Sequence, residues 1–73
     1  MIVVNNIEFS YREGMTLQEA VDAAMRLPEI RALLNKGSHL YILNDTLVNK
    51  RDADKTLLSD SDSIKIMRMA QGG

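Results

Sequence analysis

Apolar and polar residues alternate near the start of the chain, as they do in a half-buried strand. In residues 7–11, IEFSY, the apolar side chains share one face and the polar side chains share the other. The apolar residues 2–4 come before this segment, and Asn5 and Asn6 lie between the two. Because asparagine tolerates the positive φ that tight hairpin turns require, the pattern predicts two short strands joined at these asparagines.

A helix start follows the hairpin. Thr16-Leu17-Gln18-Glu19 matches a capping box, in which the Thr16 hydroxyl and the Glu19 carboxylate each accept a hydrogen bond from an otherwise unpaired backbone N–H. Apolar residues then recur at helical spacing, and the predicted buried stripe comprises Leu17, Ala20, Val21, Ala24 and Met25. We expect this helix to pack its apolar stripe against the sheet.

Pro28 is expected to end or kink this helix, because proline lacks a backbone N–H and restricts the residue before it. Proline is nevertheless well suited to the first turn of a new helix. We therefore predict a second short helix over residues 28–36, with Gly37 at its C-terminal stop. Its apolar side comprises Ile30, Leu33 and Leu34.

The middle of the chain predicts a second pair of strands. Residues 39–44, HLYILN, carry apolar side chains on both faces, which is typical of an interior or doubly covered strand. Asn44 and Asp45 supply a turn, and residues 46–48 are expected to return as a short partner strand.

Residues 49–58 are polar until their end, which predicts a loop or a single helical turn whose Leu57 or Leu58 enters the core. After a turn at residues 60–63, residues 64–69 alternate as a last strand. This strand places Ile64 and Ile66 on one face, and Lys65, Met67 and Met69 on the other. The two methionines fit either an adaptable binding surface or ordinary packing under a loop. Together the elements predict a small α+β domain with one sheet and one main helix.

Composition narrows the class of protein. With 73 residues and 8.2 kDa, the chain has room for a single domain. Nine Lys and Arg residues are scattered among ten Asp and Glu residues, so the net charge is -1 and no basic stripe indicates nucleic-acid binding. No apolar run is long enough to span a bilayer, and no secretory signal is recognisable. We therefore expect a cytoplasmic protein without a membrane or nucleic-acid partner.

The residues that could carry catalysis or bind metal are few. The chain has no cysteine, which excludes disulfides, thiolate metal sites and a cysteine nucleophile. A single histidine, His39, cannot form a metal cluster by itself, and we expect it to be a solvated residue at the start of a strand. The carboxylate pairs of residues 52/54 and 60/62 are expected to be solvated turn residues, and no glycine-rich phosphate-binding motif is present. We predict that the chain is not an enzyme.

The chain ends in MAQGG, directly after the last predicted strand. Such an end can be a frayed terminus without a role. It also fits a reactive terminus, because adenylation would turn a C-terminal carboxylate into a mixed anhydride that sulfur or an amine can attack. Without a Cβ, Gly72 and Gly73 can enter a narrow channel and leave the carbonyl unhindered. The segment from Arg68 to Gly73 could reach roughly 20 Å if extended.

The whole chain resembles a β-grasp sulfur carrier of the ThiS and MoaD type. The resemblance rests on the opening MIVVNNIEFSY, the helix MTLQEAVDAAM, the acidic turn SDSDS, the final strand and the terminal Gly72-Gly73. It implies an α+β fold of the β-grasp, ubiquitin-like class, with a mixed sheet of four to five strands packed on one main helix. Residues 1–69 would form this domain, and residues 70–73 a flexible tail.

The resemblance also implies a function. Gly73 would be adenylated by a partner enzyme, a ThiF/MoeB-like adenylyltransferase that uses ATP and magnesium, and then converted to a thiocarboxylate that donates sulfur. The chain itself would bind no cofactor. In ThiS relatives the sulfur acceptor is thiazole synthase of thiamine biosynthesis, and in MoaD relatives it is the large subunit of molybdopterin synthase. The short chain and the polar Gln71 favour the ThiS branch.

Within this reading, Gly73 is the reactive residue and Gly72 gives access to it. Met67, Arg68, Met69 and Gln71 are the predicted partner-docking residues. Two alternatives remain open from the sequence. In a ubiquitin-like modifier the same activated glycine would pass to lysine amines of target proteins. In a non-covalent β-grasp interaction module the tail would have no role.

Overall fold

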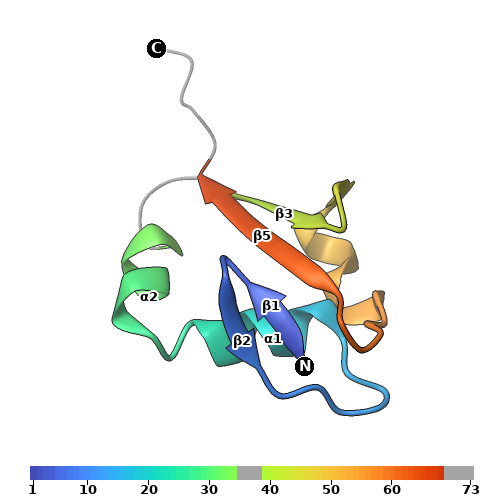
Figure 1. Cartoon of the computed structure of the whole chain (residues 1–73). Coiled ribbons are helices and arrows are strands. Elements are labelled where there is room, and N and C mark those ends of the chain that lie inside the picture. Colours follow the sequence, from blue (N-terminus) through green and yellow to red (C-terminus); the bar gives the residue numbers. More distant parts are fainter. Residues whose placement is uncertain (35–38, 69–73) are drawn as a thin grey trace.

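The computed structural model describes residues 1–34 and 39–68 of the chain (Figure 1). Five strands, two α-helices and one 3₁₀ helix make up this part. In chain order they are β1 (Ile2–Val4), β2 (Ile7–Phe9), α1 (Leu17–Ala24), α2 (Pro28–Leu34), β3 (His39–Leu43), β4 (Thr46–Val48), η1 (Lys50–Lys55) and β5 (Ser63–Arg68). Every strand and helix expected from the sequence is therefore present, with bounds that differ by a few residues.

The five strands form one mixed sheet in the order β2-β1-β5-β3-β4. The last strand in the chain is thus the central strand of the sheet. β5 pairs in parallel with β1, where Val4 lies opposite Ile64, and antiparallel with β3, where Tyr41 lies opposite Ile66. The two hairpins, β1–β2 and β3–β4, flank it on either side (Figure 1). This arrangement, with α1 packed on the sheet, confirms the predicted β-grasp fold.

The hydrophobic core lies between the sheet and α1. Ile64 and Ile66 of β5 are 1% and 2% exposed, and they belong to the same buried cluster as the apolar residues of α1. In the part of the chain that the structure describes, the buried core comprises Ile2, Val4, Met15, Leu17, Ala20, Val21, Ala24, Ile30, Tyr41, Ala53, Leu58, Ile64 and Ile66. Because this set draws on both hairpins and on the helix, the central strand is held by contacts from the whole domain.

Both hairpin turns adopt the left-handed backbone that the sequence predicted for the first of them. Asn5 and Asn6 have φ of 50° and 69°, and Asn44 and Asp45 have φ of 48° and 70°. Two consecutive residues with positive φ are the signature of a two-residue turn whose twist matches that of the flanking strands. The turns therefore fix the register of both hairpins.

The capping box at the start of α1 is confirmed. The backbone N–H of Glu19 donates to the Thr16 hydroxyl, and the Glu19 carboxylate accepts from the Thr16 N–H at 2.9 Å. The Arg12 guanidinium also pairs with Glu19. The sequence prediction was wrong for Met25, which is 37% exposed because the helix ends at Ala24 and the chain then turns ahead of Pro28.

Pro28 is the first residue of α2, as predicted. The buried side chain of Ile30 packs α2 against the core. Arg31 of α2 links the two helices, since its guanidinium donates to the carbonyl oxygens of Met25 and Arg26 at 3.2 and 3.1 Å. Met25 is the C-cap of α1 and Arg26 follows it, so Arg31 ties α2 to the turn between the two helices. The expected end of α2 at residue 36 and the glycine stop after it lie outside the described residues.

The polar segment after β4 contains the short helix η1. Of the two leucines that follow it, Leu58 enters the core and Leu57 does not. Leu58 is 5% exposed, whereas Leu57 is 68% exposed. Tyr11 supports this segment by donating its hydroxyl to the Leu58 carbonyl at 3.2 Å. None of the helices in the described ranges is long and apolar enough to cross a membrane.

Candidate functional site

The candidate site begins at the C-terminal end of β5, where the predicted docking residues start. Met67 and Arg68 are both exposed and are the last two residues of the strand. The predicted docking residues Met69 and Gln71 and the predicted reactive residues Gly72 and Gly73 lie outside the described residues. Met67 points away from the core, because residues alternate along β5 and both Ile64 and Ile66 are buried in the core.

The face of the sheet turned away from α1 carries a row of apolar side chains. Leu40 lies directly opposite Met67 in the β3–β5 ladder, and Ile42 lies opposite Leu47 in the β3–β4 ladder. Met67 and Leu47 are 43% and 60% exposed, while Leu40 and Ile42 are half-buried. We call Leu40, Ile42, Leu47 and Met67 the apolar strip. Apolar side chains gathered on an exposed face often mark an interaction surface.

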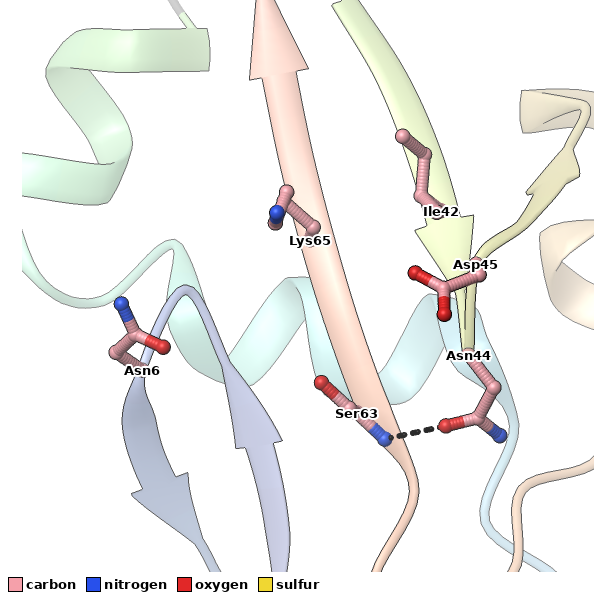
Figure 2. Close-up of a pocket in the computed structure, with 6 residues that line it drawn as sticks. All are labelled: Asn6, Ile42, Asn44, Asp45, Ser63 and Lys65. Carbon is pink, nitrogen blue, oxygen red and sulfur yellow. Dashed lines mark hydrogen bonds between the residues drawn. The ribbon is translucent and has the colours of Figure 1, made fainter.

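A hollow of about 330 Å³ lies on the same face, between the two hairpin turns. Figure 2 shows Asn6 on one side of β5, Asn44 and Asp45 on the other, and Ser63 and Lys65 on the strand between them. Ile42 of the apolar strip also lines the hollow. The lining therefore offers amides and both signs of charge beside the apolar strip.

The Asn44 side chain is held in place at the edge of this hollow. Its Oδ1 accepts from the Ser63 N–H at 2.9 Å (Figure 2). Its Nδ2 donates to Asp62 Oδ1 at 2.9 Å. Asp62 accepts a further hydrogen bond from the Ser59 N–H at 2.7 Å. Asp62 thus works as a turn residue, as predicted.

The other predicted turn carboxylates are exposed or form an ion pair. Asp52 and Asp54 are exposed on η1, and Asp60 forms an ion pair with the amino group of Met1. His39 is half-buried with its ring beside that of Tyr41, rather than solvated as expected, because β3 is an interior strand. Within residues 1–34 and 39–68, no group of three or more His, Cys, Asp or Glu side chains could hold a metal ion.

Among residues 1–34 and 39–68, the pKa values of Glu19, Asp60 and Tyr41 are shifted by local, structural causes. The hydrogen bond from the Thr16 backbone lowers the pKa of Glu19, with the Arg12 guanidinium adding to the effect. The hydrogen bond from the Met1 amino group lowers the pKa of Asp60. Burial, assisted by the charge of Asp22, raises the pKa of Tyr41. None of these three groups lines the hollow, so the shifts give no indication of acid–base chemistry there.

Sequence reasoning selected Met67 and Arg68 but missed the rest of the exposed apolar face. The signal was present in HLYILN, whose apolar residues point to both faces of the strand. Periodicity alone does not say whether the second face is covered. Only the sheet order shows that Leu40 and Ile42 lie next to β5 and on the same side as Met67.

Comparison with protein-family models matches the ThiS family over residues 2–73. The match spans the β-grasp domain and continues through the terminal Gly72-Gly73. A search of curated proteins returned no match. The family match covers the chain almost from end to end and agrees with the observed sheet order and helix. The chain therefore belongs to the ThiS family.

Proposed function

We propose that this protein carries sulfur as a thiocarboxylate on Gly73 and delivers it for the thiazole of thiamine. Membership of the ThiS family supports the role of a small sulfur carrier rather than an enzyme. The observation that carries the proposal is that the family match runs through Gly72 and Gly73, the two residues whose chemistry suits an activated terminus. The favoured acceptor of the sulfur is a thiazole synthase.

Activation follows from the chemistry of a carboxylate. A Gly73 carboxylate oxygen attacks the α-phosphorus of ATP, which the partner adenylyltransferase binds together with magnesium. Pyrophosphate is the leaving group. The terminal sulfur of a persulfide donor then attacks the acyl carbon and displaces AMP, which gives an acyl disulfide. A thiol reduces the S–S bond to the donor, and the thiocarboxylate is left on Gly73. Glycine favours both steps, because the absence of a Cβ gives the partner free access to the acyl carbon.

Docking is proposed to use the end of β5 together with the apolar strip. The partner's active site must lie within reach of the residues that follow Arg68, so the partner must contact the domain near that end. Met67 and Leu40 are opposite each other there. Methionine suits such a contact, since its unbranched side chain adapts to the opposing surface. Met69, Arg68 and Gln71 complete the proposed docking set.

The experiment that tests this function is intact mass spectrometry. The protein is incubated with a ThiF/MoeB-like adenylyltransferase, ATP, magnesium, a persulfide donor and a thiol reductant. We expect a mass gain equal to the exchange of one oxygen for sulfur. The matched controls are a variant without Gly73 and a variant with one alanine added after it, and neither should gain mass while both stay folded by circular dichroism.

Three results would contradict the proposal. An unchanged mass with adenylyltransferases that activate another carrier in parallel would favour the non-covalent interaction module. Covalent conjugates to lysines of other proteins on a denaturing gel, without free thiocarboxylate, would favour the ubiquitin-like modifier. Sulfur transfer to a molybdopterin synthase large subunit but not to a thiazole synthase would move the protein to the other branch of carriers.

A further inference from the structure

β5 continues beyond the strand that pairs with it on one side. Along the parallel ladder, the Val3 N–H donates to the Asp62 carbonyl and the Asn5 N–H donates to the Ile64 carbonyl, both at 3.0 Å. β1 ends at Val4, and the chain then turns back through the positive φ of Asn5. The next N–H and carbonyl on this side of β5 belong to Ile66, and no backbone of β1 remains to meet them.

The side chain of Asn5 takes the place of that missing backbone. Its Oδ1 accepts from the Ile66 N–H at 2.7 Å, and its Nδ2 donates to the Ile66 carbonyl at 3.3 Å. One primary amide thus repeats the donor and acceptor that another strand residue would have supplied. Ile66 is only 2% exposed, so water could replace these hydrogen bonds only in part. Loss of the Asn5 amide would therefore leave the Ile66 N–H and carbonyl unsatisfied and would lower the stability of the fold.

On the opposite side of β5, Asn44 extends the ladder with β3 through its backbone N–H and its side-chain carbonyl. Its backbone N–H donates to the Ser63 carbonyl at 2.8 Å, and its Oδ1 accepts from the Ser63 N–H at 2.9 Å. The two asparagines therefore extend the two ladders that flank the central strand. They differ in position, because Asn44 acts at the first residue of β5 and Asn5 acts two residues before its last, Arg68.

We propose that Asn5 is a positioning residue that fixes where and in which direction the C-terminal segment leaves the sheet. Its amide anchors Ile66 to the β1–β2 hairpin at the last point before the exit. When this amide is lost, β5 stays paired with β3 through Met67 and Arg68. The hydrogen bonds that hold Ile66 to the β1–β2 hairpin are then missing. Docking through the apolar strip then persists while Gly73 reaches the partner's active site less often in a productive geometry. This inference rests on the proposed function.

The test uses variants that keep the turn. Asn5→Gly removes the amide while accepting positive φ, and Asn5→Asp keeps the acceptor for the Ile66 N–H but loses the donor. Thr16→Ala is the control for a general loss of stability, because it removes a hydrogen bond at the start of α1, outside the candidate site. Hydrogen exchange of β5 amides is measured by NMR, and kcat and KM are measured for activation of each full chain by the adenylyltransferase.

We expect Asn5→Gly to accelerate exchange at the Ile66 N–H and to lower kcat about tenfold with KM unchanged, since misplacement of a reacting group costs rate rather than binding. Asn5→Asp should restore protection of the Ile66 N–H but only part of the lost kcat, because its second carboxylate oxygen faces the Ile66 carbonyl without a proton to donate. Thr16→Ala should keep the wild-type kcat and the wild-type exchange at the Ile66 N–H relative to the rest of β5, although it also lowers the stability. If Asn5 acted only through stability, Asn5→Gly and Thr16→Ala would lower kcat alike.

Unchanged exchange at the Ile66 N–H in Asn5→Gly would overturn the inference, and so would equal losses of kcat in Asn5→Gly and Thr16→Ala. A wild-type chain that no active adenylyltransferase modifies would overturn the proposed function itself, and the positioning role with it. The exchange measurement separates the two cases, because it reports on the Asn5 amide without any partner enzyme.

Discussion

Each face of β5 carries a large apolar side chain, but the two faces have different surroundings. Ile64 and Ile66 are almost completely buried in the core, whereas Met67 is 43% exposed on the opposite face. The core face draws on residues from both hairpins and from the helix. The open face has no helix or other element of the described chain packed on it (Figure 1). One strand therefore combines the centre of the core with the centre of the proposed docking surface, and substitutions on its two faces should separate stability from activation.

The largest expected effect is on the core face. Ile64→Ala should lower the free energy of unfolding by about 3 kcal/mol, because a fully buried isoleucine loses its transfer free energy and leaves a cavity. Urea denaturation monitored by circular dichroism measures the loss. Met67→Ala is the matched comparison on the open face and should cost about 0.5 kcal/mol or less. Equal losses for the two variants would contradict the assignment of the faces.

The next effect is on the open face and concerns activation. Met67→Asp should lower kcat/KM for activation by the adenylyltransferase about thirtyfold, equivalent to about 2 kcal/mol for an anchoring residue of an interface, with little change in Tm. Leu57→Asp is the matched control, since Leu57 is 68% exposed and does not belong to the apolar strip. A similar loss of activation in both variants would show that added charge, rather than the position, is responsible.

A smaller effect is expected where α1 begins, on the covered side of the sheet. Thr16→Ala removes the hydroxyl that accepts from the Glu19 N–H and should cost about 1 kcal/mol of stability. Thr16→Ser keeps the hydroxyl and should restore most of it. Thermal unfolding measures both variants. Activation of the folded protein should stay at the wild-type rate in each, because the cap is not part of the open face.

Local signals in the sequence predicted most of the fold. The Asn5-Asn6 turn, the capping box at Thr16 and the helix start at Pro28 depend on neighbouring residues, and all three are present. Features set by distant contacts were not predictable. Leu57 and Leu58 are equally apolar, and only packing against the rest of the chain selects Leu58 for the core.

The candidate site was less predictable for the same reason. The exposed side of Met67 could be expected from alternation along the strand, but its neighbours in the apolar strip follow from the sheet order. Asn5 shows the limit most clearly. Its identity predicts a turn, while its side chain pairs with Ile66, which is 61 positions away in the sequence. A periodicity argument contains no information about such a pair.

The smallest effect is a pH dependence at the helix that covers the core face. The Thr16 backbone hydrogen bond and the Arg12 guanidinium lower the pKa of Glu19 from its ordinary value of 4.5. A carboxylate with a depressed pKa in the folded state contributes stability at pH above its unfolded value, and this contribution is lost as the pH falls through the folded value. The wild-type protein should therefore lose stability below about pH 4.5, and Glu19→Gln should lose less over the same range because glutamine also completes a capping box without titrating. Urea denaturation of the two proteins at a series of pH values checks the difference, and parallel curves would show that the Glu19 charge contributes nothing to folding.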